Sequence, residues 1–234
     1  MSKPDTAAKK NLTEDATLQE PPQQRALLLL SGGFDSTVAG NRLVQLGWQV
    51  DALHFSGEPV VPDISARVAE LARHIPASRM WVATLGPAQA KIVERCFRRF
   101  YYVILRRLMM RIAAGLARRE SISALATGDN LGQVGSQTVE NMFCIDEAAA
   151  SAGVRVLRPV LSWDKVDIIR QAQRIGTYEL SSAPEMCNAL GPKDPKTRSR
   201  LDKVLREEAR LDMDALVAGA LEAMRAQGLA APSH

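Results

Sequence analysis

The segment 25–37, which reads RALLLLSGGFDST, constrains the fold of this 234-residue chain more than any other. Its four consecutive leucines, followed by Ser-Gly-Gly, favour a short strand that is buried on both faces. The two glycines allow the backbone to approach a ligand without a Cβ in the way. Asp35-Ser36-Thr37 then favour the start of a helix. Because a strand, a glycine turn and a helix start bring free N–H groups and the positive end of a helix to one spot, the segment predicts an anion-binding site.

Strand-like and helix-like segments alternate along the rest of the chain. Strands are predicted at residues 27–30, 48–55, 80–85, 122–126 and 154–157, and helical segments at 38–46, 63–75, 88–119 (broken near residue 101) and 165–175. This alternation predicts an α/β fold: a parallel five-stranded sheet with helices on both faces, joined by right-handed crossovers. The expected domains are a disordered tail over 1–24, the sheet domain over 25–196 and a C-terminal helical extension over 197–234. The extension is expected to pack on the sheet domain, with homodimerisation as the alternative.

Composition excludes several classes of protein. The chain has 30 Lys and Arg against 26 Asp and Glu, and three scattered cysteines without a Cys-x-x-Cys pair. That cysteine pattern argues against a disulfide scaffold and a structural zinc site. No apolar run approaches the roughly 20 residues of a membrane span, and the N-terminus lacks the apolar core of a signal peptide. A reducing cytoplasm is therefore the expected location.

Two familiar phosphate loops do not match the glycine turn. A Walker loop needs a lysine that is absent here, and a dinucleotide fingerprint needs Gly-x-Gly-x-x-Gly. Ser31-Gly32-Gly33-Phe34-Asp35-Ser36 instead resembles the pyrophosphate loop (PP-loop) of the N-type ATP pyrophosphatases. That resemblance implies an enzyme that binds ATP, adenylates its substrate and releases pyrophosphate.

Further segments extend the resemblance to one branch, the tRNA 4-thiouridine synthetase or thiamine biosynthesis sulfurtransferase (ThiI) family. The matching segments, in chain order, are SGGFDS at 31–36, His54-Phe55, RLMMR at 107–111, Thr127-Gly128, LGQVGSQT at 131–138, Leu157-Arg158-Pro159 with Asp164-Lys165, RIGT at 174–177 and PEMC at 184–187. The Gly-Gln-Val-x-Ser-Gln-Thr and Pro-Glu-x-Cys elements are specific to this branch. The resemblance implies thiolation of a tRNA uridine with ATP and Mg²⁺.

The resemblance also implies residue roles. The ATP-binding residues would be Leu29, Leu30, Ser31, Gly32, Gly33, Asp35, Ser36, His54, Phe55, Arg107, Gly128 and Gln137, with Arg106 in place of Arg107 if the helix register differs by one. The catalytic residues would be Asp35, Lys165 and Cys187. Asp35 would work with Mg²⁺ or position the leaving group, Lys165 would stabilise charge at phosphorus, and Cys187 would resolve the sulfur transfer. No metal centre built from protein ligands alone is predicted.

Some of these residues have a plain alternative reading. From its position, His54 could equally be a satisfied histidine at a strand end. Cys187 lies in a long loop with three prolines and could be a loop cysteine without a role, whereas Cys96 and Cys144 sit in apolar helical segments and are expected in the core.

The helical stretch 91–119 carries nine basic residues against one acid, Glu94. Such a stripe predicts phosphate contacts with tRNA, while a solvated helix face is the alternative. Full-length members of the resembled family carry a THUMP-containing RNA-binding region, and many carry a rhodanese domain. This sequence matches neither, so we expect RNA-binding help and sulfur, from a cysteine desulfurase or a separate rhodanese, to arrive in trans.

Three functions remain open from the sequence. The first is ATP-dependent thiolation of a tRNA uridine. The second is the same adenylation chemistry on a small molecule or a protein carboxylate. The third is a nucleotide-binding subunit without turnover, which the presence of Asp35, Lys165 and Cys187 disfavours.

Overall fold

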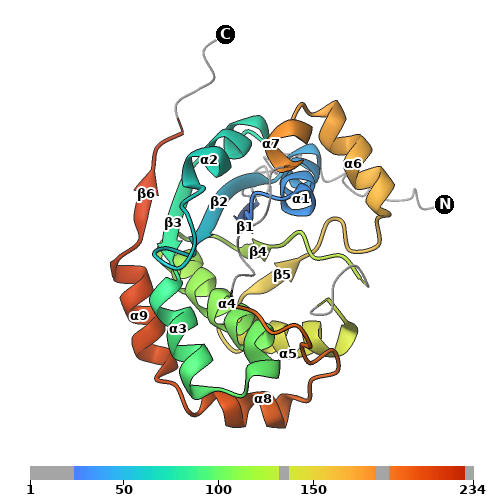
Figure 1. Cartoon of the computed structure of the whole chain (residues 1–234). Helices are drawn as coiled ribbons and strands as arrows, with labels where there is room; N and C mark the ends of the chain where they lie inside the picture. Colours follow the sequence, from blue (N-terminus) through green and yellow to red (C-terminus); the bar gives the residue numbers. More distant parts are fainter. Residues whose placement is uncertain (1–23, 132–136, 183–189, 230–234) are drawn as a thin grey trace, which may run out of the picture.

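The computed structural model describes residues 24–131, 137–182 and 190–229, which form one sheet between two layers of helices (Figure 1). The strands are β1 (Arg25–Leu29), β2 (Gln49–Ser56), β3 (Met80–Thr84), β4 (Ala124–Ala126), β5 (Arg155–Leu157) and β6 (Arg225–Gln227). Their order across the sheet is β5-β4-β1-β2-β3-β6. The first five strands pair in parallel, which confirms the predicted α/β class and the parallel five-stranded core.

The sixth strand corrects the prediction of a five-stranded sheet and of a purely helical extension. β6 pairs antiparallel with β3, with Met80 opposite Gln227 and Val82 opposite Arg225. Three residues are too short to show the alternation by which a strand is recognised in a sequence. β6 thereby pairs with the N–H and C=O groups on the outer edge of β3, which would otherwise be exposed.

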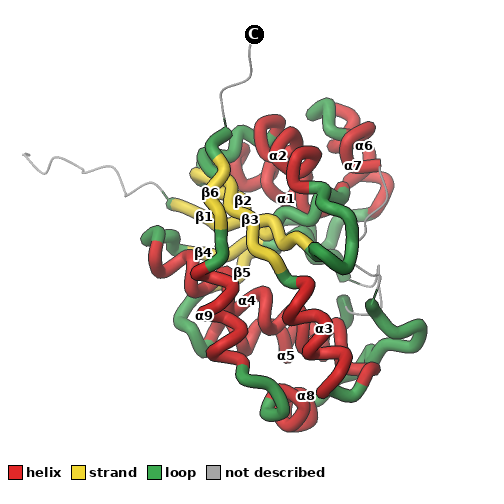
Figure 2. The backbone as a smooth tube through the Cα atoms, turned by 60° about the vertical axis from the view of Figure 1, so that its left-hand side comes forward, coloured by secondary structure: helices red, strands yellow, loops and turns green. Residues whose placement is uncertain are grey.

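The helices divide between the two faces, as predicted. One layer contains α1 (Phe34–Gln45), α2 (Ser65–His74), α6 (Lys165–Arg174) and α7 (Tyr178–Ser182); the other contains α3 (Gly86–Arg95), the 3₁₀ turn η1 (Arg98–Phe100), α4 (Tyr101–Arg119), α5 (Val139–Ala150), α8 (Leu201–Glu208) and α9 (Met213–Glu222). Figure 2 shows the sheet edge-on between the two layers. The break predicted near residue 101 is the η1 turn between α3 and α4. No helix in the described ranges is long and apolar enough to cross a membrane.

The leucine run lies in the middle of both cores. Leu27 and Leu29 belong to the core under α4, whereas Leu28 and Leu30 belong to the core under α1 and α2. Successive side chains of a strand point to opposite faces, so a central strand that is covered on both sides needs apolar residues at every position. β1 is therefore the best-defined strand in the sequence.

Helix α4 lies at the centre of its layer, so the basic residues in its middle are buried or half-buried. Arg107 is 0% exposed and donates to Glu208 (Nε–Oε1 2.8 Å) and to Glu147 (2.7 Å). Arg111 donates to both oxygens of Glu208, at 2.7 and 3.0 Å. The prediction that residues 91–119 present a single basic surface to RNA is therefore wrong for the middle of α4, because the balancing acids come from α5 and α8.

The pair between α8 and α4 gives a stability prediction. We expect Glu208→Gln to lower the free energy of unfolding by about 3 kcal/mol, because it leaves the buried guanidinium of Arg107 with an incomplete set of charged partners. Urea unfolding at neutral pH measures the change. Asp202→Asn on the same helix is the control, since Asp202 makes exposed ion pairs with Arg200 and Arg206 and should cost less than about 1 kcal/mol.

The same carboxylate predicts a pH dependence. Burial alone would raise the pKa of Glu208, but Arg111 and Arg107 outweigh it and hold the pKa below its ordinary value. Such a group stabilises the fold above its unfolded pKa, and this contribution is lost as the pH falls through the folded pKa. The difference in unfolding free energy between wild type and Glu208→Gln should thus be largest at neutral pH and shrink below about pH 4. A difference that does not change with pH would contradict the assignment.

Candidate functional site

The Ser-Gly-Gly loop lies at the carboxyl end of β1, where the sheet topology opens a crevice. β1 pairs with β2 on one side and with β4 on the other, so the connections on its two sides run in opposite directions. Ligands of doubly wound sheets bind at this kind of switch point. Gly33 is the N-cap of α1, with φ −91° and ψ 173°, and has no side chain with which to cap the helix. The first-turn N–H groups of α1 therefore face the crevice without a side-chain acceptor at the cap position.

Two serines hold the loop in shape. The Ser31 and Ser36 hydroxyls are 3.0 Å apart, and the N–H of Ser31 donates to the Ser36 hydroxyl (3.2 Å). The N–H of Gly33 donates to the Ser31 hydroxyl (3.2 Å). Between them Gly32 has φ +95°, and a Cβ there would lie 3.2 Å from a Val68 methyl group. The loop is thus closed into a ring by its own hydrogen bonds, and the positive φ of Gly32 favours glycine at that position.

Gly128 lies against the first turn of α1, beside this ring. It follows Thr127 at the end of β4, and a Cβ built on it would lie 2.3 Å from the amide nitrogen of Ser36 and 2.6 Å from its Cα. The contact is backbone against backbone, so no side chain can move aside to relieve it. The carboxyl end of β4 and the first turn of α1 therefore touch directly, which brings the two predicted glycine turns to one place.

Lys165 and Asp35 meet beside the loop although they are 130 residues apart. The Lys165 ammonium lies 3.0 and 3.2 Å from the two carboxylate oxygens of Asp35, and 5.6 Å from the centre of the Phe34 ring. Their side chains are 47% and 27% exposed. Lys165 is the first residue of α6 and Asp35 is in the first turn of α1, so two helix N-termini bring these side chains together.

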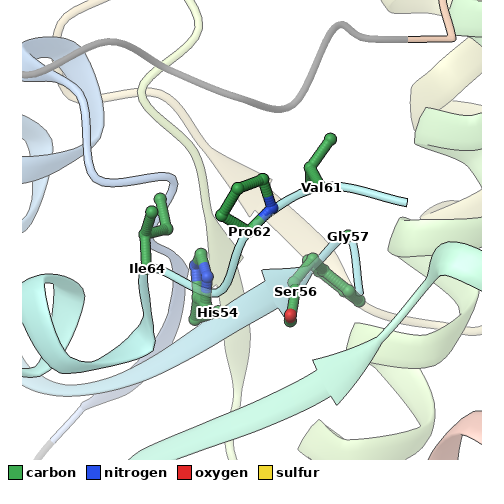
Figure 3. A pocket seen from close by; sticks show the side chains of 7 residues that line it. His54, Ser56, Gly57, Val61, Pro62 and Ile64 are labelled. Atoms are coloured by element: carbon green, nitrogen blue, oxygen red, sulfur yellow. The ribbon is translucent and has the colours of Figure 1, made fainter. Parts of the chain in front are cut away.

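His54 points from β2 toward the loop that carries Pro62 and Ile64 (Figure 3). Its Nδ1 lies 3.0 Å from the Leu30 carbonyl oxygen, so Nδ1 carries the hydrogen and donates. Burial lowers the pKa of His54, against the opposing effect of that carbonyl, and the ring is neutral at physiological pH. The other nitrogen, Nε2, is buried without a hydrogen-bond partner among the described residues. It is therefore a buried acceptor without a donor, on a side chain that lines the small pocket with Pro62 and Ile64.

Leu29, Leu30 and Phe55 lie at the same end of the sheet as His54. The N–H of Leu30 donates to the Leu53 carbonyl (2.9 Å), which continues the β1–β2 ladder past the end of β1. Phe55 and Leu29 pack into the core under α4, whereas Leu30 packs under α1. A small pocket at this end is lined by His54, Phe55, Ser56, Gly57, Val61, Pro62 and Ile64. Leu29, Leu30, His54 and Phe55, four of the residues predicted to bind ATP, thus approach this edge from both faces of the sheet.

Of the two candidate arginines, the structure brings Arg106 and not Arg107 to this region. Arg106 donates to Asp129, which directly follows Gly128. Asp129 is buried, accepts from the Thr127 hydroxyl (2.8 Å) and pairs with Arg158 (3.2 Å). Burial alone would raise the pKa of Asp129, but the two arginines outweigh it and lower the pKa. Asp129 was not singled out in the sequence, although an acid directly after a strand-end glycine turn is a usable signal.

The remaining predicted residues are less well placed or lie outside the described ranges. Gln137 directly precedes Thr138, the N-cap of α5, and its Oε1 is buried without a partner in the described part of the chain. Cys187 lies outside the described residues. Cys96 and Cys144 are buried, which confirms their predicted core positions. Burial raises the pKa of both thiols, for Cys96 to about 11, so neither is a reactive thiolate at neutral pH.

Comparison with known proteins decides the family. A family model described as thiamine biosynthesis protein (ThiI) matches residues 22–213, most of the chain. The chain belongs to the ThiI family. Its relatives include a probable tRNA sulfurtransferase of Thermus thermophilus, 42% identical over 205 residues (85% of this chain, 50% of the relative), and one of Nocardia farcinica, also 42% identical over 205 residues (85% and 49%). The chain spans about half the length of the curated relatives it matches.

Solved structures agree with the family assignment. A crystal structure of a 4-thiouridine synthetase–RNA complex with bound ATP superposes with a TM-score of 0.82 at 31% identity, over 87% of this chain and 55% of the other. An NMN synthetase from Francisella tularensis superposes with a TM-score of 0.51 at 14% identity, over 86% of this chain and 85% of the other, which is a likeness of fold alone. The ThiI-type fold thus extends through the β1 loop, the β4 turn and the start of α6.

The contact of Gly128 with α1 gives a testable prediction. We expect Gly128→Ala to push the first turn of α1 away from β4 and to lower the free energy of unfolding by about 1–3 kcal/mol, because the new methyl group overlaps fixed backbone. Hydrogen exchange should speed up at the first-turn amides of α1. Gly219→Ala in α9 is the control: a Cβ there meets nothing within 4 Å, so it should be neutral or stabilising. Unchanged exchange in α1 would show that the contact is not tight.

Proposed function

We propose that this chain is the ATP-using domain of a tRNA thiolation enzyme, which adenylates a uridine carbonyl and then replaces AMP by sulfur. One observation carries the proposal: the hydrogen-bonded ring at 31–36, the uncapped N-terminus of α1 and the Lys165–Asp35 pair converge at the switch point of the sheet. Free backbone N–H groups and a nearby cation are what the terminal phosphates of ATP need. The probable tRNA sulfurtransferases among the relatives, and the RNA and ATP of the 4-thiouridine synthetase complex, suggest the substrate class.

The chain's own groups divide the work as follows. The first-turn N–H groups of α1 and the hydroxyls of Ser31 and Ser36 would hold the β- and γ-phosphates, and Gly32 and Gly33 leave room for their close approach. His54 offers a neutral ring with Nε2 as an acceptor, which suits the amino group of an adenine. Arg106, held by Asp129, takes the place predicted for Arg107. Lys165 faces the phosphorus that is attacked and the pyrophosphate that leaves, so it stabilises charge that grows in the transition state.

The proposed reaction has two steps, adenylation of the uracil and its thiolation. Uracil O4 attacks the α-phosphorus, the bond to the β-phosphate oxygen breaks, pyrophosphate leaves, and the uracil N3 proton is released. Sulfur from a donor then attacks C4 of the ring, and the C4–oxygen bond breaks with loss of AMP. In the first step the protein lowers the activation barrier by positioning the reactants and stabilising charge, and it forms no covalent bond to the substrate.

A magnesium ion fits this site as part of the nucleotide rather than as a resident metal. The described residues contain no group of three or more His, Cys, Asp or Glu side chains that could hold a metal ion. Mg²⁺ commonly binds through one or two carboxylates together with substrate phosphates, and Asp35 is a carboxylate at the loop. When bound, the ion would neutralise phosphate charge.

The thiol that completes sulfur transfer is proposed to be Cys187. The chain has three cysteines, and burial raises the pKa of both Cys96 and Cys144. Neither of these two can act as a thiolate at neutral pH without local opening. With a persulfide donor, the terminal sulfur of the donor would bond to C4. The Cys187 thiolate would then attack the donor's other sulfur and break the S–S bond, which releases the thiolated base. The resulting disulfide between Cys187 and the donor would be reduced by an external thiol. The donor itself is proposed to be a separate protein.

The overall proposal is tested with ATP labelled at the α-phosphate, Mg²⁺, total tRNA and sulfide as a simple sulfur source. We expect AMP and thiolated nucleoside to appear together and to depend on the tRNA. AMP triggered by a metabolite without RNA would favour adenylation of a small molecule instead. ATP binding without AMP under any of these conditions would favour a subunit without turnover.

Lys165 gives the sharpest test of the site. We expect Lys165→Ala to slow AMP formation by about 10²–10³-fold, because it removes charge stabilisation from the departing pyrophosphate, while ATP affinity changes much less. Single-turnover measurement separates the two effects. Arg170→Ala is the matched control: Arg170 lies on the same helix, is exposed and pairs only with Asp167 among the described residues, so its loss should leave the rate unchanged. Equal rates for wild type and Lys165→Ala would remove Lys165 from the mechanism.

Cys187 is tested by separating the two half-reactions. With a persulfide donor, we expect Cys187→Ser to abolish repeated formation of thiolated nucleoside but to keep tRNA-dependent pyrophosphate release, because the thiol acts only after adenylation. The Cys96→Ser and Cys144→Ser variants should keep both steps if they remain folded. Normal multiple-turnover thiolation by Cys187→Ser would show that another group resolves the persulfide.

A further inference from the structure

The residues around η1 and α8 form the most basic part of the chain. We define the basic surface as residues 91–100 together with 190–210; these two stretches contain eleven Lys and Arg against five Asp and Glu, a net charge of +6. The entire 234-residue chain has a net charge of only +4, so the remainder is net negative. Positive charge is therefore gathered here and not spread over the molecule.

The two stretches lie side by side in the fold. The N–H of Phe97 donates to Glu207 (2.8 Å), and Arg98 donates to the Leu190 carbonyl (2.9 Å). Arg99 pairs with Asp194 (3.0 Å). The end of α3, the η1 turn, the segment 190–200 and α8 are thus neighbours in space, and Figure 1 shows α8 at the bottom of the molecule, below α3 and α4.

Most of these cations are free to change partners. Arg198 is 84% exposed and lies 3.8 Å from Glu140, and Arg206 is 78% exposed and lies 3.7 Å from Asp202. Lys203 is also exposed. Exposed ion pairs of this length contribute little to stability, so phosphate oxygens can replace the carboxylates at small cost. Arg106, Arg107 and Arg111 differ because they are held by acids in the interior.

The chemistry of the surface favours a nucleic acid over an acidic protein or a lipid. Seven of the eleven cations are arginines, whose planar fork suits phosphate better than the ammonium of lysine. The ring of Phe97 is 56% exposed in their midst and offers a face on which an unpaired base can stack.

The surface begins close to the candidate site along the chain. Tyr178 of α7 packs on Phe34 beside the PP-loop, with ring centres 5.5 Å apart, and α7 ends at Ser182. The chain is next described at Leu190, where the basic surface starts. Eight residue steps span at most about 28 Å, so one arm of a folded RNA can reach both places.

We propose that the basic surface, and not the α4 stripe, is where this chain contacts the phosphate backbone of its RNA substrate, with Phe97 against an unpaired base. This inference rests on the proposed function for the identity of the polymer. It assigns the contact to Arg198, Lys203 and Arg206 among others, all of them remote from the ATP-binding groups in sequence.

The test compares two triple variants of the full chain that lose the same charge. Arg198→Ala/Lys203→Ala/Arg206→Ala removes three cations from the basic surface. Arg118→Ala/Arg119→Ala/Arg155→Ala removes three exposed cations outside the basic surface, at the end of α4 and the start of β5. Binding of fluorescently labelled total tRNA is measured over a series of salt concentrations. Circular dichroism and ATP binding check that both variants keep the fold and the site.

We expect the basic-surface variant to bind tRNA at least tenfold more weakly and to lower the slope of log affinity against log salt by about 2–3, because each lost phosphate contact removes close to one unit. The control variant should stay within about twofold of wild type. Equal losses in both variants, or wild-type binding by the first, would overturn the proposal. Binding of the wild type to vesicles of phosphatidylcholine and phosphatidylserine but not to tRNA would also overturn it.

Failure of the proposed function would look different. If wild type binds tRNA through this surface but makes no AMP with it, the adenylation proposal fails while the RNA surface stands. If AMP forms with tRNA and the basic-surface variant needs the same tRNA concentration as wild type for half-maximal rate, the adenylation proposal stands and the RNA surface fails. The Phe97→Ala variant tests the stacking contact separately. We expect it to bind tRNA more weakly with an unchanged slope of log affinity against log salt, because stacking involves no charge.

Discussion

The backbone contact between Gly128 and the first turn of α1 is the constraint on which the site depends. With a side chain at position 128, β4 and α1 could not approach to van der Waals distance, and the Thr127–Asp129 turn would move away from the Ser31–Ser36 ring. The same approach places Asp129, and with it Arg106, next to the crevice. A single missing Cβ therefore couples the phosphate loop to the next strand of the sheet, and two short glycine turns become one site.

Helix α4 shows how one helix serves two purposes through adjacent arginines. Arg106 faces the crevice side and is fixed by Asp129, whose second oxygen is held by Arg158 and Thr127. Arg107, one residue later, points into the layer of α5 and α8 and fixes the C-terminal segment through Glu208. Neighbouring residues of a helix point about 100° apart, so this division follows from helix geometry. The C-terminal helices thus support the element that carries a candidate ATP-binding arginine.

The sequence predicts the parts of this protein whose signals are local, and it fails where partners are distant. The apolar run over residues 26–30, the glycines at the turn and the strand–helix alternation are read directly from neighbouring residues. The buried state of Arg107 is not, because its acids lie 40 and 101 residues away in the sequence. β6 is missed for the same reason, since Arg225–Gln227 becomes a strand only by meeting the open edge of β3. The choice between Arg106 and Arg107 required the register of α4 against its neighbours.

The ion pair of Lys165 and Asp35 offsets the positive charge where two helix N-termini meet. Two helix N-termini and an ammonium group would repel each other if no anion lay between them, and the Asp35 carboxylate supplies that anion at 3.0 Å. Because the pair is partly exposed, its contribution to stability is small, and the more highly charged phosphates of ATP can displace it. The carboxylate is then left beside the phosphates, where a magnesium ion can share it, and the lysine is left beside the phosphorus. After this exchange of partners, Lys165 and Asp35 become the two charges that the proposed reaction requires.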